Sequence, residues 1–327
     1  MHVYRDEDAD LALIRGRRVA VIGYGNQGRA QALNLRDSSV AVAIGLPEGS
    51  ASRARAAADG FDVMTAAQAS EKADLVVMLA ADELHSRIYS DEVAPNLAEG
   101  AALLFAHGLS IRFGLIEPRP DLDVVLVAPK GPGTALRSEY ERGRGLIALF
   151  AVHQDASGRA GATALSYAAA IGSGRVGILE TSFAEECEAD LFNEQAVLWG
   201  AIPELIHAGF ETLVDAGFSP EIAYFECLTE VKLIADLIYE RGIAGMREAI
   251  SNTAEFGALK GGTRIVTADT RTEMRRILRE VKSGSFVKEL IADSEAGYPR
   301  LKASRGKAAV HPIETVGERL RRLQGEP

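Results

Sequence analysis

The fold is decided by residues 18–35, RVAVIGYGNQGRAQALNL. A strand pattern, RVAVI, runs directly into a glycine-rich turn, and an Ala-rich helical pattern follows at once. In this G-x-G-x-x-G motif the first glycine permits the tight turn, the second admits a pyrophosphate, and the third lets helix and strand pack. The helix N-terminus adds unpaired N–H groups for phosphate. The stretch predicts a dinucleotide cradle rather than an ordinary turn, made by Gly23, Tyr24, Gly25, Asn26, Gln27 and Gly28.

Outward from this stretch, β-branched runs alternate with Ala-rich helical runs up to about residue 180. The alternation predicts parallel strands joined by crossover helices, that is, a doubly wound α/β sheet of the Rossmann type. From residue 182 helical periodicity dominates. We expect a dinucleotide-binding domain over residues 1–181 and an all-helical domain over 182–327. The strand runs are 18–23, 40–45, 74–79, 102–108, 123–131, 146–152 and 175–179, and the helical runs are 185–199, 203–216, 220–240 and 270–292.

Composition narrows the class of partner. The chain has 327 residues, 47% hydrophobic content and a formal net charge of −10. No large basic field is present, which argues against nucleic acid or an anionic membrane surface. The N-terminal stretch is acidic where a secretory signal is basic, and no apolar run approaches the ~18 residues of a membrane span. The two cysteines, Cys187 and Cys227, are too few for a disulfide framework. We expect a cytoplasmic protein that acts on a small molecule.

The loop after the second strand run bears on which dinucleotide binds. Glu48 lies 20 residues past Gly28, where an acidic side chain would hold a ribose 2′-hydroxyl and favour NAD. Ser50, Ser52 and Arg53 could instead bind a 2′-phosphate through hydroxyl and guanidinium donors. Glu48 could equally be a solvated loop charge. The loop leaves both cofactors open.

Two pairs of carboxylates stand out in the helical half. Asp190 and Glu194 have the same i, i+4 spacing as Glu226 and Glu230. Such residues differ by about 40° around an α-helix, so each pair projects from one face. Four converging carboxylates would repel one another unless cations neutralise them, and hard oxygen ligands suit Mg²⁺. The first pair could also belong to a solvated acidic helix start. The second lies in residues 223–240, AYFECLTEVKLIADLIYE, an apolar helix that we expect to be buried.

Together these stretches resemble a ketol-acid reductoisomerase (acetohydroxy-acid isomeroreductase) of the short, class I bacterial form. The resemblance covers nearly the whole chain and is carried by VIGYGNQGRAQALNLRDS, FAHGLSIRFG, APKGPG, AVHQDASG, EADLFNEQAVLWG, AGFETLVDAGFSPEIAYFECLTEVKLIADLIYE and ISNTAEFG, in this order. It implies Mg²⁺-dependent alkyl migration in acetolactate or acetohydroxybutyrate and reduction by NAD(P)H, in valine and isoleucine biosynthesis. It also implies two Mg²⁺ ions, NADPH as cofactor with NADH possible, and a knotted helical domain in a homodimer or larger homo-oligomer.

The resemblance assigns the carboxylates to metal. Asp190 matches the aspartate that bridges both ions, and Glu194 matches a ligand of one of them. Glu226 and Glu230 match a pair that serves the other ion from the neighbouring subunit, and Glu230 is also counted among the catalytic groups. Active sites shared between subunits are therefore implied.

The resemblance assigns three further polar residues to catalysis and substrate. His107 and Lys130, which follow the strand runs ALLFA and VVLVAP, match active-site residues. Ser251 matches the serine that binds the substrate carboxylate, although by itself it fits the N-cap of the following turn. Gly133, in APKGPG, is added to the cofactor-binding residues.

Departures from the family pattern leave other functions open. Arg29, Gln31 and Thr134 stand where the family pattern has histidines, and Pro47 stands where an arginine is common in the adenosine loop. A specialised paralogue acting on another keto acid, a metal-independent hydroxy-acid dehydrogenase and a catalytically silent nucleotide-binding protein are the alternatives. Magnesium dependence separates the isomeroreductase from the hydroxy-acid dehydrogenase.

Overall fold

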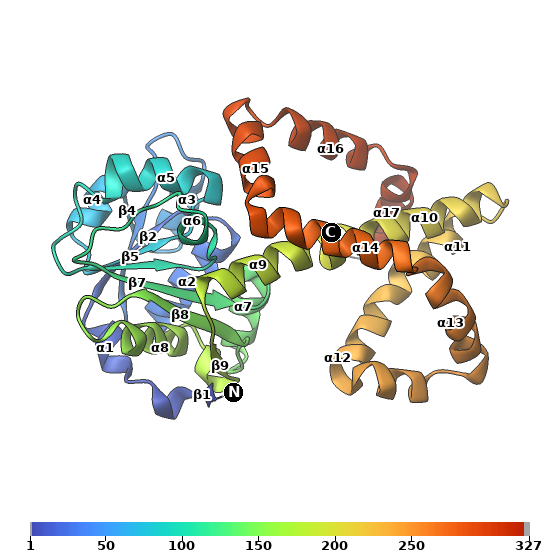
Figure 1. Cartoon of the computed structure of the whole chain (residues 1–327), viewed down its shortest axis with the longest axis horizontal. Helices are drawn as coiled ribbons and strands as arrows, with labels where there is room; N and C mark the ends of the chain where they lie inside the picture. Colours follow the sequence, from blue (N-terminus) through green and yellow to red (C-terminus); the bar gives the residue numbers. More distant parts are fainter. Residues whose placement is uncertain (1, 324–327) are drawn as a thin grey trace. The chain divides into compact units, whose positions relative to one another are not determined.

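A computed structural model describes residues 2–323 of the chain (Figure 1). Contacts divide it into an N-terminal unit, Met1–Ala189, and a C-terminal unit, Asp190–Pro327. The dividing point lies inside helix α9 (Phe183–Asn193), whereas the boundary predicted from the sequence falls just before that helix begins.

The N-terminal unit is built on one nine-stranded sheet in the order β1-β9-β8-β7-β6-β5-β2-β3-β4. The parallel strands β2 to β7 confirm the doubly wound core of the prediction. The strands are β1 (Val3–Tyr4), β2 (Arg18–Ile22), β3 (Ala41–Gly45), β4 (Asp62–Met64), β5 (Leu75–Met78), β6 (Ala102–Phe105), β7 (Asp123–Pro129), β8 (Ala148–Gln154) and β9 (Ile178–Glu180).

The expectation of parallel strands is wrong for one predicted strand, β8. Strand β8 runs antiparallel to β7, and β1 runs antiparallel to β9, so the sheet is mixed. The chain returns from β7 through α7 (Gly133–Glu141) to pair directly with the strand it has just left, and an antiparallel neighbour needs no crossover. Strands β1 and β4 were not predicted, because two or three residues are too few to show a periodicity.

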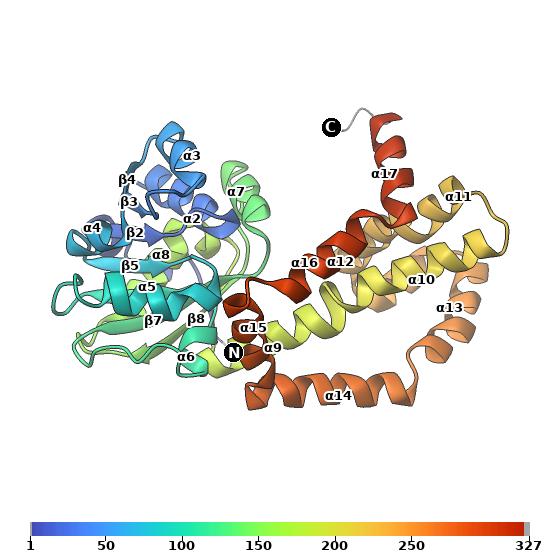
Figure 2. The same ribbon diagram turned by 90° about the horizontal axis from the view of Figure 1, so that it is seen from above.

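Alternate residues of each central strand enter two separate cores. Val19 and Val21 of β2 face helices α1, α2 and α8, whereas Ala20 and Ile22 face α4 and the turns after β5. Helix α7 packs along α2 on the first side. Figures 1 and 2 show these helices on opposite faces of the sheet. The helices are α1 (Leu11–Arg15), α2 (Asn26–Asp37), α3 (Ser52–Ala58), α4 (Ala66–Glu71), α5 (His85–Ile88), α6 (Leu109–Arg112), α7 and α8 (Ala160–Ala170).

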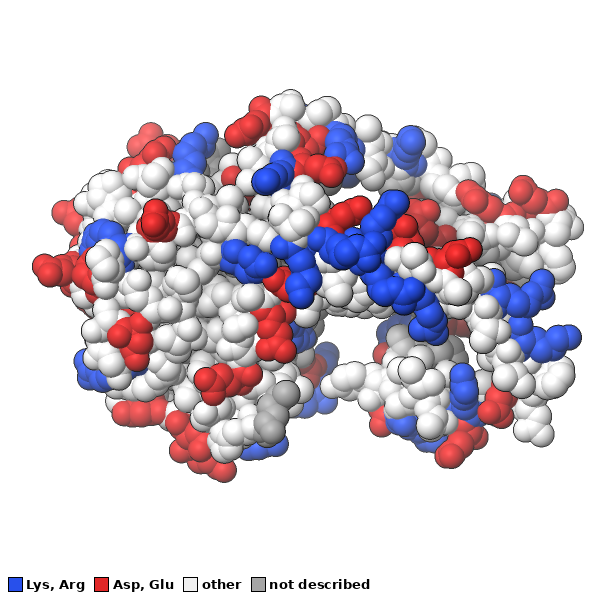
Figure 3. Space-filling view, viewed as in Figure 1, with Lys and Arg blue, Asp and Glu red and all other residues white. Residues whose placement is uncertain are grey.

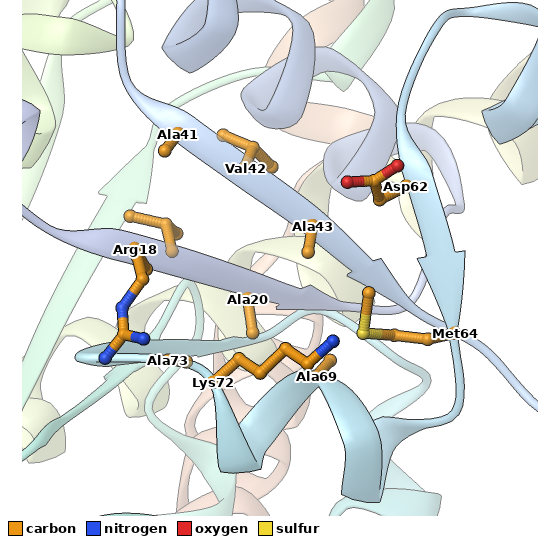
Figure 4. Close-up of a pocket in the computed structure, with 11 residues that line it drawn as sticks. Arg18, Ala20, Ala41, Val42, Ala43, Asp62, Met64, Ala69, Lys72 and Ala73 are labelled. Carbon is orange, nitrogen blue, oxygen red and sulfur yellow. The ribbon is translucent and has the colours of Figure 1, made fainter.

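A pocket of about 210 Å³ remains where α4 covers the sheet (Figure 4). Helix α4 has only six residues, and the side chains that meet beneath it from β2, β3 and α4 are small. Alanine methyl groups fill this space poorly, which is why the pocket persists. Its lining includes Ala20, Ala43, Ala69 and Ala73, with Arg18, Asp62 and Lys72 among the charged residues.

The C-terminal unit is helical, as predicted, and its helices are interrupted in characteristic ways. Two π-helical turns, Glu194–Leu198 and Phe225–Thr229, follow α9 and α11. Gly284, with φ of +77°, ends α14 and starts α15, so the single helix expected over 270–292 is two helices. The remaining bounds are α10 (Ala201–Asp215), α11 (Pro220–Tyr224), α12 (Glu230–Ala249), α13 (Asn252–Ile265), α14 (Ala268–Ser283), α15 (Ser285–Glu295), α16 (Pro299–Ala309) and α17 (Pro312–Leu323).

The apolar helix expected to be buried over residues 223–240 is instead largely exposed in the single chain. Leu233 is 62% exposed and Tyr239 is 91% exposed, and α12 and α13 contain no buried residue within the described part of the chain. The small core of this unit lies between α10, α11 and α17, around Phe210 and Tyr224. Figure 3 shows Lys and Arg side chains in a band over α14, the helix with Arg271, Arg275, Arg276, Arg279 and Lys282.

None of the helices within residues 2–323 has both the length and the apolar content needed to cross a bilayer.

Candidate active site

The glycine-rich turn has the geometry of a dinucleotide cradle. Gly23 has a φ of +104°, and a Cβ there would lie 2.5 Å from the backbone N of Ala80. A Cβ at Gly28 would overlap the carbonyl oxygen of Gly23, so helix α2 touches the turn. Gly25 is exposed and has no atom within 4 Å of its Cβ position. A tight turn, an open middle glycine and a close helix contact are what a bound pyrophosphate requires, so the residues present fit a dinucleotide.

Tyr24 anchors this turn from beneath. Its hydroxyl donates to Oδ2 of Asp59 at 2.8 Å, and the Arg29 guanidinium binds the same carboxylate at 2.7 Å. The hydrogen bond from Arg29 lowers the pKa of Asp59 to about 2, despite the opposing effect of burial. Arg29, which departs from the family pattern, therefore has a structural task at the cradle.

The loop that follows β3 exposes one carboxylate, whereas its Arg53 guanidinium is hydrogen-bonded to backbone oxygens. Glu48 is exposed at the carboxyl end of β3. The Arg53 guanidinium donates to the backbone oxygens of Leu46 at 2.8 Å and Met64 and Val63 at 3.3 Å. The Ser50 hydroxyl accepts from the N–H of Ser52 at 3.3 Å. Arg53 thus joins the ends of β3 and β4 and is already committed to backbone acceptors.

His107 and Lys130 lie just past the carboxyl ends of the neighbouring strands β6 and β7, where ligands of open α/β sheets collect. Both contact Glu186 of helix α9. Lys130 Nζ donates to Oε1 of Glu186 at 2.9 Å, and His107 Nδ1 lies 3.2 Å from Oε2. The N–H of Gly108 donates to the same Oε2 at 2.9 Å. One buried carboxylate, 2% exposed, therefore holds both predicted active-site residues in place.

The charges in this cluster stabilise one another. Burial alone would raise the pKa of Glu186, but hydrogen bonds and charge from His107 and Lys130 outweigh it, so the pKa is lowered. Burial would likewise lower the pKa of His107. Its contacts with the Cys187 thiol and with Glu186 raise that pKa well above its ordinary value. Both contacts favour the protonated form of His107.

Gly108 is the reason helix α9 can approach so closely. A Cβ at Gly108 would overlap the carbonyl oxygen of Phe183 and would lie 2.9 Å from the Cβ of Cys187. The first turn of α9 therefore rests on the backbone just after His107. This contact carries Glu186 to the strand ends.

Asp190 lies one turn beyond Glu186 on the same helix. Asp190, Glu186 and His107 each offer one ligand atom, and these three atoms lie within 4.8 Å of one another. Glu194 follows in the π-helical turn, where the N–H of Trp199 donates to the Glu194 carbonyl at 2.9 Å. π-Bulges of this kind occur frequently at functional sites. Glu186 accepts hydrogen bonds from the Gly108 N–H and from Lys130 Nζ, and the carboxylates of Asp190 and Glu194 offer oxygens of the kind that a hard cation such as Mg²⁺ prefers.

The structure of the single chain does not bring the second carboxylate pair into this cluster. Glu226 lies in the other π-helical turn and Glu230 begins α12, and both are exposed. Among the described residues, the one group of three or more potential metal ligands is His107, Glu186 and Asp190. Ser251 is the N-cap of α13, and its hydroxyl accepts from the N–H of Ala254 at 3.2 Å.

Glu186 is the functional residue that the sequence did not reveal. It lies in the acidic run AEECEAD, where charge at a helix start is commonly solvated. The signal that could have found it is the glycine after His107, since HG at a strand end permits a close helix contact. Which acidic residue of that helix would face inward depends on its rotation, which periodicity alone does not settle.

A Rossmann cradle next to a loop whose lysine is paired with a buried carboxylate is typical of a nicotinamide-dependent oxidoreductase, and the fold and site assign the chain to that class. Residues 13–177 match the family description "Acetohydroxy acid isomeroreductase, NADPH-binding domain", and residues 183–325 match "Ketol-acid reductoisomerase, C-terminal domain". The chain belongs to the ketol-acid reductoisomerase family. It is accordingly an NAD(P)H-dependent oxidoreductase and isomerase, as the resemblance implied.

Similar solved structures agree with this assignment. An NADH-preferring ketol-acid reductoisomerase from an uncultured archean is 44% identical, with a TM-score of 0.96, and the match covers 99% of each chain. Two more distant structures share the fold alone. An NAD-binding semialdehyde dehydrogenase protein from Cupriavidus necator has 16% identity and a TM-score of 0.62 over 82% of this chain and 99% of its own. A pyrroline-5-carboxylate reductase from Streptococcus pyogenes has 17% identity and a TM-score of 0.53 over 82% and 98%.

Proposed function

We propose that this chain converts acetolactate or acetohydroxybutyrate into the corresponding 2,3-dihydroxy-3-alkyl acid, as an enzyme of valine and isoleucine biosynthesis. The observation that carries the proposal is the buried carboxylate of Glu186, which holds Lys130 and His107 beside Asp190 at the strand ends. In this proposal the N-terminal unit binds the dinucleotide, and the C-terminal unit supplies metal ligands, the substrate serine and the surface for dimerisation.

Each side chain has a separate task. Asp190 and Glu194 hold Mg²⁺, which when bound polarises the substrate carbonyl and stabilises a developing alkoxide. Lys130 and His107 are oriented by their contacts with Glu186 and would donate N–H groups to the substrate. Ser251 binds the substrate carboxylate. These groups raise the rate by stabilising charge that develops in the transition state.

Glu226 and Glu230 complete the metal site from a second copy of the chain. Both are exposed, and the helix that carries Glu230 also exposes Leu233 and Tyr239. Apolar surface of this extent on neighbouring helices is typical of an interface between subunits. A homodimer, or a larger assembly built from it, would bury this surface and present the two carboxylates to the partner's Asp190 and Glu194.

Mixing two inactive variants tests this shared site. Asp190→Asn and Glu226→Gln each remove one ligand, and each alone should lose the Mg²⁺-dependent isomerisation of acetolactate. In a mixed dimer one of the two sites has both changes and the other has neither. Unfolding and refolding an equal mixture should therefore recover about a quarter of the parent activity, given random pairing of copies. Recovery of none would show that all four ligands come from one chain.

We further propose that NADH is the preferred cofactor, the reverse of the order suggested by the resemblance. Glu48 presents a carboxylate where the adenosine ribose would lie, and a 2′-phosphate would be repelled there. Arg53 is bound to three backbone carbonyls and is poorly placed to neutralise that phosphate. The NADH preference of the archean relative supports the same choice.

Exchange of the loop carboxylate tests the cofactor proposal. Glu48→Ser should raise the ratio of NADPH to NADH efficiency about tenfold, which corresponds to 1.4 kcal/mol of relieved repulsion. Glu7→Ser removes a different exposed carboxylate of the N-terminal unit and should leave the ratio unchanged. An unchanged ratio in Glu48→Ser would make Glu48 a solvated bystander.

The cytoplasm is the proposed location. Cys187 and Cys227 are both free thiols, which suits a reducing compartment.

A further inference from the structure

A chain of side-chain hydrogen bonds runs through the interior of the N-terminal unit to the loop that carries Lys130. It starts at Tyr167 of α8, whose hydroxyl donates to Oε1 of Gln31 at 2.7 Å. Gln31 Nε2 donates to Oε1 of Gln27, one turn earlier on α2, at 3.0 Å. Gln27 Nε2 donates to the carbonyl oxygen of Gly131 at 2.8 Å. We call these three side chains the amide relay.

Two of the three relay side chains are fully buried, Gln27 is half-buried, and every donor in the relay points the same way. Tyr167 and Gln31 are both 0% exposed, so neither can exchange its partner for water. Each glutamine uses its oxygen as an acceptor and its NH₂ group as a donor, so removal of any member leaves an unpaired buried group behind. Aligned hydrogen bonds also polarise one another. The relay therefore has one arrangement in which all its groups are satisfied.

The relay ends where the dinucleotide cradle meets the active site. The Gly131 carbonyl belongs to the peptide before Pro132, which has no N–H of its own, and Gly131 has a φ of +156°. Gly133 packs so closely on the first turn of α2 that a Cβ there would overlap the carbonyl oxygen of Asn26. Gln27 is itself a residue of the cradle. The same short loop begins with Lys130, whose Nζ reaches Glu186.

We propose that Tyr167 and Gln31 are positioning residues for the reductive half of the reaction. They hold the Gln27 side chain, and through it the Gly131 carbonyl, so that the dinucleotide cradle and the loop of Lys130 keep one relative geometry. Neither residue touches the site itself. The role given to Lys130 in this inference rests on the proposed function. The expected effect of the relay on dinucleotide binding does not depend on the proposed function.

Three substitutions test the relay by NADH titration, followed by fluorescence, without Mg²⁺ or substrate. Tyr167→Phe keeps the ring and removes the donor, and Gln31→Met keeps the shape and removes both polar atoms. Each should raise the Kd for NADH about tenfold, because the cradle loses a fixed Gln27. Gln31→His keeps one acceptor and one donor, so it should recover most of the affinity lost in Gln31→Met.

Ser166→Ala is the matched control. Ser166 is the residue before Tyr167 on α8 and is also 0% exposed, but its hydroxyl bonds Asp10 at 2.6 Å and Ile14 at 3.1 Å, away from the relay. Its loss should lower Tm without changing the Kd for NADH. In the full assay with acetolactate and Mg²⁺, the relay variants should lower kcat while the KM for acetolactate stays within about twofold.

The outcomes separate this inference from the proposed function. Parent-like NADH affinity in both Tyr167→Phe and Gln31→Met, with a Tm loss like that of Ser166→Ala, would reduce the relay to a structural role and overturn the inference. Failure of Gln31→His to recover affinity would also count against it. If the parent binds NADH but does not turn over acetolactate, the proposed function fails, and the NADH titrations still decide the relay.

Discussion

The two units differ in how much of their apolar surface is buried. Central strands of the N-terminal unit are buried on both faces, and residues such as Val77 and Leu104 are 0% exposed. In the C-terminal unit, α12 and α13 expose leucine, isoleucine, tyrosine and phenylalanine side chains. Among the described residues, 18 of the 22 large exposed hydrophobic side chains lie in this unit.

The carboxylates of the two units differ in the same way. Glu186 is buried, accepts from the Gly108 N–H and Lys130, and lies 3.2 Å from His107 Nδ1, whereas Glu226 and Glu230 are exposed among apolar residues. A buried carboxylate is stable only with its donors, and an apolar helix face is stable in water only when something covers it. The N-terminal unit therefore builds its part of the site from its own chain, whereas in the proposed function the C-terminal unit would need a second copy to cover its apolar helices.

A charge placed on the exposed face of α12 tests this dependence most strongly. Leu233→Glu should separate the copies, because an unpaired carboxylate cannot be buried in an apolar interface. Each site would lose two metal ligands, so kcat should fall about a thousandfold, equivalent to some 4 kcal/mol. Light scattering with size exclusion gives the mass, and acetolactate-dependent oxidation of NADH gives the rate.

Val152→Glu is the control for that change. Val152 is a 41% exposed apolar residue on β8 of the N-terminal unit. The variant should keep the mass and activity of the parent. A Leu233→Glu chain that stays associated and active would mean that α12 is not the surface between copies.

Removal of the charge on Glu186 tests the part of the site that the N-terminal unit builds from its own chain. Glu186→Gln keeps the volume, but its NH₂ group would face another donor, and Lys130 would lose its counter-charge. We expect kcat to fall about 10- to 100-fold, the usual effect of losing a residue that orients an active group, with the mass unchanged. Glu188→Gln removes a carboxylate bound to Arg112 at 2.7 Å on the same helix and should keep nearly full activity. An equal loss of kcat in both variants would show that activity depends only on the overall charge of α9.

The contrast also separates what the sequence predicted from what it could not. The strand, the three glycines and the following helix were found correctly, because these are local patterns with fixed spacing. The antiparallel β8 was missed because strand direction depends on which neighbour pairs with it. Apolar periodicity alone did not predict that residues 223–240 are exposed in the single chain. The periodicity indicates that one face of a helix is buried, but it does not indicate whether the same chain or another copy buries that face.

Two salt bridges of the N-terminal unit should make stability depend on pH, and NADH binding should distinguish between them. The pKa of Asp59 is about 2, below its ordinary 3.8, because Arg29 binds it. A depressed pKa stabilises the fold above pH 3.8, and this contribution is lost as the pH falls toward about 2. Asp59→Asn should lower the free energy of unfolding at pH 7 by about 1–2 kcal/mol, and the difference from the parent should vanish near pH 2. Urea titrations at both pH values measure it.

Asp121→Asn provides the comparison. The hydrogen bond from Arg119 also lowers the pKa of Asp121 to about 2, but this pair lies far along the chain from the glycine-rich turn. Both variants should lose stability with the same dependence on pH. Only Asp59→Asn should weaken NADH binding, because Asp59 also accepts from the hydroxyl of Tyr24 in the cradle. Equal NADH affinity in the two variants would show that the Tyr24 contact does not shape the cradle.

The smallest effect concerns a poorly filled place in the N-terminal unit, the pocket under α4 (Figure 4). Ala43→Val adds two methyl groups on β3, where a branched side chain is favoured, and should raise the free energy of unfolding by about 0.5–1 kcal/mol. Ala54→Val, on the exposed face of α3, should instead cost a few tenths of a kcal/mol, because β-branching disfavours a helix. Thermal unfolding with both variants gives the sign. A loss of stability in Ala43→Val would mean that this core has no spare volume, and that the contrast between a filled N-terminal unit and an uncovered C-terminal unit is sharper than the pocket suggests.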